Sequence, residues 1–431
     1  CLISEAQNTY SIDPQEVDYV EPTPENDAIG GKKSAISYVP KSVLSEGRWV
    51  KVRINSSGMK RLTKAALSKM GFADISAVSV YGNGGFDVSH LVSDNKSDDL
   101  KKLSVYRTDD AVLFYARDSK RWSWNIDGSL SCEQSEYDTY TYYYITDSQK
   151  PSVVPDSCYS ATLPVVERVS DYNYRLHHEL HSENLLLSGQ EWYGESISGD
   201  KPTKVLSFTL PKRGACDSLF VTCDLIGRSG SVMKYKAYYN DVLIYSGQFD
   251  PVNTSSTVDD YATYDGFCKT VIAKDKERNE LKFVLSSNSS SDYAWIDKVT
   301  ITSRSDLDMT NVSDLIVCNA KSNYVDYGDR LPMKDVKGSL EYNVSGADAS
   351  YVVWKVDDYI DPVVMPTTFS DGKLRFVHDK DKVVDFVIFN PNGSIEEPEV
   401  VGVVENQNLH GLPSVNYVIV YHPDFKDEAE R

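Results

Sequence analysis

The sequence has no apolar run long enough to cross a membrane, and its cysteines are few and scattered. No segment approaches the roughly 18 to 20 apolar residues of a membrane-spanning helix. The seven cysteines form no Cys-x-x-Cys pair, so the ligand spacing of common metal sites is absent. An odd count leaves at least one thiol free or bonded to another molecule, and a Cys132–Cys158 disulfide is one pairing that an oxidising compartment would allow. The cysteines are Cys1, Cys132, Cys158, Cys216, Cys223, Cys268 and Cys318.

Basic residues are also in short supply. Lys and Arg total 45 against 64 Asp and Glu, which gives a net charge of −19. Nucleic acids and anionic lipids bind basic surfaces, so this charge argues against both as general partners. Hydrophobic residues at 41% and charged residues at 25% are typical of a soluble globular protein. The 431 residues are enough for two to four domains, and the 29 tyrosines favour strands.

Residues 1–35 are expected to form no domain. Residues 5–31 contain seven acidic residues, three prolines and no Lys or Arg, which is typical of a solvated, disordered arm. Ser4 and Ala6 are spaced as at a signal-peptide cleavage site, so residues 1–7 are interpreted as the tail of an export signal. The alternative is that Cys1 is the lipid-bearing first residue of a mature lipoprotein.

Three further regions show the closely spaced apolar runs of β-strands, separated by turn residues. In residues 36–165 the runs are 47–54, 77–81, 111–115 and 140–145, with Trp122 and Trp124 between them. In residues 166–305 the runs are 204–210, 218–226, 234–239, 241–245, 281–285 and 299–301. This spacing without a helical period predicts a jelly-roll-like β-sandwich. In residues 306–402 the runs are 351–356, 374–378 and 383–389.

One short helix is predicted within the first region, over residues 62–71. Thr63 can cap its start, and Leu67 and Met70 share a face. Gly71 can end the helix in the left-handed conformation.

The last stretch has a different pattern. Residues 415–421 are a β-branched and aromatic run bounded by prolines, which predicts a buried strand. Asp424 can then cap a helix over residues 425–431. A strand that leads into a helix is the first half of a βαβ unit. Residues 403–431 are therefore expected to begin an α/β domain that continues beyond this sequence.

Two local motifs suggest ligand sites. The loop Gly82-Asn83-Gly84-Gly85 lacks the Lys-Ser/Thr that follows in a P-loop, so a turn is expected. The group His177, His178, Glu179 and His181 suggests a metal site. It does not match His-Glu-x-x-His, and we expect it to lie in a connection.

Two other features suggest carbohydrate chemistry. Glu191 and Glu195 could form the carboxylate pair of a glycosidase, but sequence spacing does not fix the separation that this reaction needs. A structural role is favoured for both. Trp295 lies in residues 293–301, at the end of the sandwich region, and this segment resembles the last strand of jelly-roll modules that sometimes bind sugars. For Trp295, a role in the core is favoured over a sugar contact.

Six blocks, in one order, resemble a known family across residues 40–431. They resemble the N-terminal half of the PorU family, the gingipain-type cysteine peptidases that act as C-terminal signal peptidase or sortase of the Bacteroidetes type IX secretion system. The blocks are residues 47–52 (GRWVKV) with 58–63 (GMKRLT), 80–85 (VYGNGG), 188–195 (SGQEWYGE), 353–356 (VWKV), 406–412 (NQNLHGL) and 418–425 (VIVYHPDF).

The resemblance implies an exported protein at the cell surface, associated with the outer membrane. Such a protein removes the C-terminal sorting domain from secreted cargo and joins the new end to an anionic lipopolysaccharide. A caspase-like α/β domain of the family holds a Cys nucleophile and a His base. This sequence ends at the first strand and helix of that domain, no cysteine matches the nucleophile's position, and neither His410 nor His422 is assigned as the base.

We therefore expect two or three β-rich domains that carry no catalytic residue, cofactor or metal. Their expected partners are the chain's own peptidase domain, the secretion cargo and outer-membrane secretion proteins, with lipopolysaccharide reached through the intact enzyme and no nucleic acid bound. The alternative is a surface adhesin or carbohydrate-binding β-sandwich protein.

Overall fold

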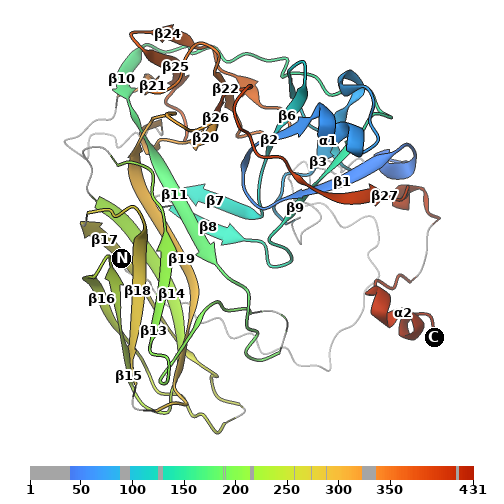
Figure 1. Cartoon of the computed structure of the whole chain (residues 1–431). Helices are drawn as coiled ribbons and strands as arrows, with labels where there is room; N and C mark the ends of the chain where they lie inside the picture. Colours follow the sequence, from blue (N-terminus) through green and yellow to red (C-terminus); the bar gives the residue numbers. More distant parts are fainter. Residues whose placement is uncertain are drawn as a thin grey trace, which may run out of the picture. The chain divides into compact units, whose positions relative to one another are not determined.

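The computed structural model describes most of the chain after residue 38. The described residues are 39–87, 98–124, 130–187, 189, 191–213, 218–256, 258–272, 274–287, 289–322, 336–413 and 417–431. They are mainly β, as predicted, with several sheets and few helices (Figure 1). The expected N-terminal arm, Cys1 and Cys216 lie outside them. No helix among these residues is long and apolar enough to span a membrane.

The N-terminal sheet contains a strand from the far end of the chain. Its order is β27-β1-β9-β3-β4. These strands are β1 Trp49–Ile54, β3 Ser79–Gly82, β4 Lys101–Lys102, β9 Thr141–Thr146 and β27 Glu399–Val404. β1 buries Val50, Val52 and Ile54 on one face, which confirms the alternation predicted for it. β27 pairs antiparallel with β1 across the predicted boundary between residues 402 and 403, and the two lie side by side in Figure 1.

The predicted helix forms as α1, Lys64–Lys69. The hydroxyl of Thr63 accepts a hydrogen bond from the backbone N–H of Ala66 at 3.1 Å, which satisfies one of the first unpaired donors of the helix. Leu67 and Met70 are buried against the N-terminal sheet, and Gly71 has a φ of 93°. The cap, the apolar face and the stop are all confirmed.

The β6 sheet, in the order β2-β6-β5, is buried on both faces. Its strands are β2 Gly58–Thr63, β5 Tyr106–Arg107 and β6 Ala111–Ala116. On β6, Val112, Phe114 and Ala116 pack with the N-terminal sheet. The alternate residues, Leu113 and Tyr115 among them, pack with Trp354 and Phe389. Two buried faces explain why this strand is apolar throughout.

The β26 sheet lies on the other side of that second cluster and is also buried on both faces. Phe386 and Ile388 of β26 face one core, while Val387 and Phe389 face the cluster shared with β6. The sheet, in the order β20-β26-β22-β23, comprises β20 Asp314–Val317, β22 Val352–Lys355, β23 Val363–Val364 and β26 Phe386–Phe389. The regions predicted at 36–165 and 306–402 therefore share a hydrophobic core.

A fourth sheet covers the far face of the β26 sheet. The core between them contains Leu340, Tyr342, Phe376 and Phe386. This β21 sheet, in the order β10-β21-β25-β24, comprises β10 Val165–Val169, β21 Ser339–Val344, β24 Thr368–Ser370 and β25 Lys373–Asp379. β10 pairs parallel with β21, and the other neighbours are antiparallel.

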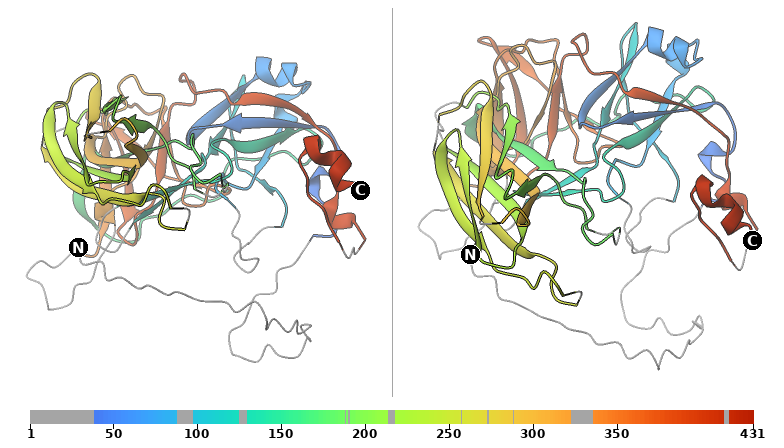
Figure 2. Two further views of the ribbon diagram at one scale, coloured as in Figure 1. Left: turned by 90° about the horizontal axis from the view of Figure 1, so that it is seen from below. Right: turned by 60° about the horizontal axis from the view of Figure 1, so that its bottom comes forward.

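The predicted β-sandwich is confirmed, and Figure 2 shows its strands in green to yellow. One sheet contains β11 Asp171–Glu179, β19 Tyr293–Asp306, β14 Ser218–Arg228 and β17 Thr263–Ile272 in that order, with β12 Ser196–Ser198 beside β19. The other contains β13 Thr203–Phe208, β18 Asn279–Ser286, β15 Met233–Tyr239 and β16 Val242–Phe249. Leu219, Val221, Phe283 and Ile301 lie in the core between them.

All six predicted strands of the sandwich are present, but β11, β12 and β17 were not predicted. The expectation that His177 and His178 lie in a connection is wrong, because both belong to β11. This strand carries Arg175 and His177 on one face, and these polar side chains hide the two-residue period of Tyr172, Tyr174 and Leu176.

The prediction for the last stretch is wrong in part. Residues 417–421 form no strand and are exposed, and residues 415–416 lie outside the described part of the chain. A strand needs a neighbour for its backbone N–H and C=O groups, and no described segment pairs with this one. A 3₁₀ turn, Pro423–Phe425, does lead into helix α2, Lys426–Ala429. Phe425 rather than Asp424 occupies the N-cap position, without a side-chain hydrogen bond.

The core around β6 predicts a large loss of stability when one of its side chains is truncated. Leu113 is fully buried, so Leu113→Ala should lower the free energy of unfolding by about 2–5 kcal/mol. Leu409, which is 69% exposed, supplies the control. Leu409→Ala should change stability by less than about 0.5 kcal/mol. Urea unfolding followed by tryptophan fluorescence measures both, and equal effects would contradict a core built around β6.

Candidate functional site

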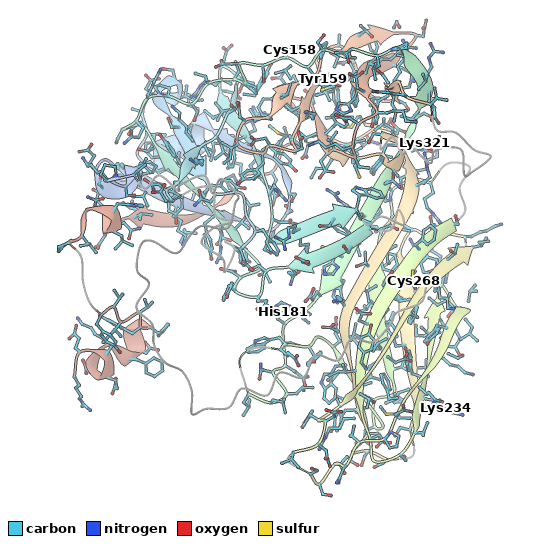
Figure 3. All side chains as sticks on the ribbon, turned by 180° about the vertical axis from the view of Figure 1, so that it is seen from behind. Cys158, Tyr159, His181, Lys234, Cys268 and Lys321 are labelled. Carbon is cyan, nitrogen blue, oxygen red and sulfur yellow. The ribbon has the colours of Figure 1, made fainter. Side chains whose placement is uncertain are left out.

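The histidines noted in the sequence converge on one carboxylate rather than on a metal position. At the end of β11, Glu179 accepts from two imidazoles, with His177 Nε2 2.8 Å from Oε2 and His181 Nε2 2.9 Å from Oε1. His177 Nδ1 also lies 2.9 Å from Thr300 Oγ1 on the neighbouring strand β19. These contacts fix the residues after β11 on the outer face of the sandwich. His181 is labelled in Figure 3.

His178 makes a separate pair. Its Nε2 lies 3.1 Å from Oε1 of Glu195, and its side chain leaves β11 on the face opposite to His177. The three imidazoles therefore do not share one centre. Among the described residues, no group of three or more His, Cys, Asp or Glu side chains is arranged to hold a metal ion.

The paired groups have shifted pKa values. Burial alone would raise the pKa of Glu179, but hydrogen bonds from His177 and His181 outweigh it and lower the pKa to about 2. The hydrogen bond between His181 and Glu179 also raises the pKa of His181, although burial alone would lower it. Stabilisation by Glu179 is lost as the pH falls towards 2, and that by His181 is lost as the pH rises through its raised pKa. The cluster is therefore most stabilising in mildly acidic solution.

A β-bulge beside this cluster contains Asp297, a carboxylate that was not identified from the sequence. The pairing of β14 with β19 shifts between Asp224 and Leu225, which leaves Asp297 as the extra residue on β19. Burial raises the pKa of Asp297 to about 6; nearby Lys298 opposes the rise, and Glu179 and Asp224 add to it. The sequence held a signal, since the adjacent polar residues Asp297 and Lys298 interrupt the alternation of β19.

Asp297, Glu179 and His181 border a small cavity of about 210 Å³. Its other lining residues are Glu136, Glu191, Trp192 and Tyr193. Glu191 and Glu195, for which the sequence favours a structural role over a glycosidase pair, are separated here: Glu191 lines this cavity and accepts a hydrogen bond from Tyr193 Oη at 3.1 Å. Glu195 instead pairs with His178. The structure thus directs the two carboxylates to different partners.

Trp295 is buried, as predicted, but outside the core between the two sheets. That core contains its neighbours Ala294 and Ile296 and not Trp295 itself. The indole Nε1 donates to Glu183 Oε2 at 2.8 Å, and the ring stacks on Tyr293 at 5.7 Å. Trp295 therefore anchors the segment after β11 to the sandwich, and its expected place in the sandwich core is corrected.

A larger cavity of about 510 Å³ lies where β2, β11 and β20 meet. The side chain of Lys60 is only 2% exposed there. Its ammonium forms an ion pair with Glu396 and donates to Ser56 Oγ at 2.9 Å. Asp314 accepts from the backbone N–H of Met59 at 3.0 Å, and burial raises its pKa.

A second ion pair lies beside the same cavity. Arg175 donates to Asp385 Oδ2 at 2.6 Å, and its guanidinium lies 5.2 Å from the centre of the Trp122 ring. Arg175 belongs to β11, whereas Asp385 directly precedes β26. The Lys60–Glu396 and Arg175–Asp385 pairs at this cavity each join segments that are distant in the sequence.

Three of the five described cysteines, Cys132, Cys223 and Cys318, are buried and poorly suited to act as nucleophiles. Burial raises the thiol pKa of Cys132 and Cys318 to about 12 and that of Cys223 well above its usual value, so none is a thiolate at neutral pH. The proposed Cys132–Cys158 disulfide is not formed, because both thiols are free. His410 Nδ1 lies 3.9 Å from Asp98 Oδ2, and His422 Nδ1 lies 3.6 Å from Asp424 Oδ2.

The glycine-rich loop is a turn, as predicted. Gly84 and Gly85 have φ values of 87° and 91°. A Cβ on Gly84 would lie 1.9 Å from the ring of Tyr359, whose hydroxyl donates to the carbonyl of Asn83 at 2.7 Å. The protein's own tyrosine therefore fills the space beside this loop.

Among solved structures, the dimeric latent PorU of Porphyromonas gingivalis has a similar fold. The TM-score is 0.73 at 24% sequence identity, over 87% of this chain and 35% of the PorU chain. This chain thus spans about a third of the length of that protein. The likeness shows a shared fold.

Other comparisons add nothing to the argument. A family 35 carbohydrate-binding module from Clostridium thermocellum matches with a TM-score of 0.18 at 10% identity, over 33% of this chain and 98% of the module. A carbohydrate-binding module that was solved with calcium and xylotriose matches with a TM-score of 0.20 at 10% identity, over 30% of this chain and 98% of the module. No protein-family model and no curated protein matches the sequence.

The raised pKa of Asp297 predicts a stabilising substitution. Between its ordinary pKa of 3.8 and about 6, the folded state binds a proton that the unfolded state has lost, so the stability of the native protein falls over this range. Asp297→Asn should therefore raise the free energy of unfolding by about 1–2 kcal/mol at pH 7 and by almost nothing at pH 4. Thermal melts across this range test it. Asp260→Asn, at an exposed position, is the control, and a gain that is independent of pH would contradict the assignment.

The buried ammonium of Lys60 predicts the effect of removing its partner. Glu396→Ala leaves Lys60 with the Ser56 hydroxyl, so the free energy of unfolding should fall by about 1–3 kcal/mol. Glu397 is exposed next to it, and Glu397→Ala should change stability by less than about 0.5 kcal/mol. Chemical unfolding of both variants distinguishes these values. Similar losses would mean that the Lys60–Glu396 pair does not stabilise the fold.

Proposed function

We propose that this chain is the N-terminal, non-catalytic region of a PorU-like C-terminal signal peptidase of the type IX secretion system. The observation that supports this most is the likeness to PorU over 87% of the chain. The order of the sequence blocks that resemble the PorU family agrees with it. The whole enzyme would remove the C-terminal sorting domain of secreted cargo and join the new end to anionic lipopolysaccharide at the cell surface.

The exposed apolar side chains near residue 431 support a docking role. In the described chain, eight large apolar residues between 409 and 425 are exposed. Exposed apolar residues gathered in one segment commonly mark a contact surface. We propose the peptidase domain as the partner of this segment. The residues are Leu409, Leu412, Tyr417, Val418, Ile419, Val420, Tyr421 and Phe425.

The work proposed for this region is to position the peptidase domain rather than to react with cargo. β27 belongs to the N-terminal sheet, and the segment with exposed apolar residues follows it directly. The Lys60–Glu396 pair also lies just before β27. A peptidase domain attached there would start from a fixed strand. Cargo and outer-membrane secretion proteins are further proposed partners of the whole enzyme.

Two exposed valines provide a matched test of this docking role. Val420 and Val258 are both 93% exposed in this chain. Neither Val420→Asp nor Val258→Asp should change the melting temperature of the chain by itself. In cells that express the full-length parent protein, Val420→Asp should cause cargo to accumulate with its sorting domain attached, because a buried unpaired carboxylate would disrupt docking. Immunoblots of cargo measure this.

The outcomes separate the possibilities. Normal cargo processing with Val420→Asp would show that this position is not covered by the peptidase domain. Normal processing after deletion of the whole parent gene would overturn the proposed enzyme function. Val258→Asp should leave processing intact.

A further inference from the structure

The segment after β11 exposes large apolar side chains beside the small cavity that contains Asp297. Leu180, Leu186, Leu187 and Trp192 are all exposed, and Leu187 is 91% exposed. Turns are usually built from Gly, Pro, Asn, Asp and Ser, so leucines at this position require an explanation. A group of exposed apolar side chains on a folded protein commonly marks a site of contact with another molecule.

The backbone of Leu187 makes its presence there more unusual. Its φ is 53°, in the left-handed region that bulky residues rarely adopt. Asn and Gly adopt this region more readily than Leu. Neither burial in the fold nor backbone geometry therefore explains a leucine at residue 187, and contact with a partner does.

Hydrogen bonds hold the loop that carries these residues in one conformation. Glu183 and Tyr193 pair through their backbones, with N···O distances of 3.0 Å and 2.9 Å, and close the loop at its base. At its surface, the indole Nε1 of Trp192 donates to the carbonyl of Gly189 at 3.3 Å. A partner would therefore meet a surface that is already ordered, which lowers the entropic cost of binding.

The adjoining cavity has an excess of negative charge. Its lining contains one imidazole and four carboxylates, namely His181 and Glu136, Glu179, Glu191 and Asp297. The imidazole is hydrogen-bonded to Glu179, and Lys298, 4.0 Å from Asp297, is shared with Asp224. Repulsion from Glu179 and Asp224 adds to the raised pKa of Asp297. A positive group in the cavity would relieve this repulsion.

The size and the aromatic walls of this cavity suit one basic side chain. Its volume of about 210 Å³ is below the range of about 300–1,000 Å³ that is typical of sites for whole small molecules. Trp192 and Tyr193 line it, and aromatic faces attract guanidinium and ammonium groups. A guanidinium can also donate to two carboxylate oxygens at once. An arginine side chain therefore fits this lining well.

We propose that Leu186, Leu187 and Trp192, together with the adjoining cavity, dock a peptide segment in which an arginine lies beside large apolar residues. The apolar residues of the peptide contact the two leucines and the indole. The arginine enters the cavity that Glu191 and Asp297 border. The inference does not depend on the proposed role in secretion.

Fluorescence anisotropy with short labelled peptides tests this. The probe is a glycine–serine peptide that contains one arginine between two leucines. One matched peptide has citrulline, which is neutral, in place of the arginine, and another has serines in place of the leucines. The full chain should bind the probe at least about tenfold more tightly than either matched peptide, because each of them lacks one of the two contacts.

Leu187→Asn is the decisive variant for the apolar contact. Asn adopts the left-handed region readily and Leu187 has almost no burial to lose, so the melting temperature should stay the same or rise. Binding of the probe should weaken about tenfold or more, because the apolar contact is lost. Val258→Asn, at a position that is 93% exposed, is the control and should leave binding unchanged.

Asp297→Asn tests the charge of the cavity. This variant should weaken binding of the probe about tenfold or more, because a charged acceptor for the guanidinium is removed. It should also raise the melting temperature at pH 7, so unfolding cannot account for the loss. Asp260→Asn removes one charge at an exposed position and should leave binding unchanged.

Several results would overturn the proposal. One is the absence of binding by the wild-type chain, and another is equal binding of the citrulline peptide. Unchanged binding by Leu187→Asn would exclude the loop. An equal loss in Asp260→Asn and Asp297→Asn would mean that the peptide responds only to the net charge of the chain. Binding to phosphatidylcholine vesicles, lost in Leu187→Asn and without binding of the probe, would identify a membrane as the partner instead.

Discussion

Burial of the β6 and β26 sheets on both faces is the constraint on which the rest of this structure depends. A sheet with two buried faces needs a cover on each side. The N-terminal sheet covers one face of the β6 sheet, the β21 sheet covers one face of the β26 sheet, and the two inner sheets cover each other. β27 completes the N-terminal sheet by pairing with β1, and Ile395, shortly before it, packs in the core that the two inner sheets share.

Two ion pairs with little-exposed cations connect parts of the chain that are far apart in the sequence. Lys60 with Glu396 and Arg175 with Asp385 each join segments more than 200 residues apart. Removing Glu396 or Asp385 leaves a little-exposed cation without its partner, so the pairs favour one arrangement of the sheets over others.

The sequence predicted the features whose causes are local. Thr63 and Gly71 set the ends of α1 through their own chemistry, and regular apolar runs identified the sandwich. It could not predict features that depend on distant partners. β11 was missed because the environment of Arg175 and His177 is supplied by Asp385 and by Thr300 of β19. Asp297 was missed because a bulge is defined by the register of two strands.

Residues 417–421 show the opposite case, in which the sequence predicts a strand that the structure does not contain. It has the β-branched and aromatic composition of a buried strand, yet its side chains are exposed and it pairs with no described segment. β26 has a similar composition and is fully buried, because strands β20 and β22 flank it and cores form on both its faces. The composition of a segment therefore indicates that it can form a β-strand, but the strand forms only where neighbouring strands are available to pair with it. Residues 417–421 pair with no described strand, and the peptidase domain is the partner that we propose for them.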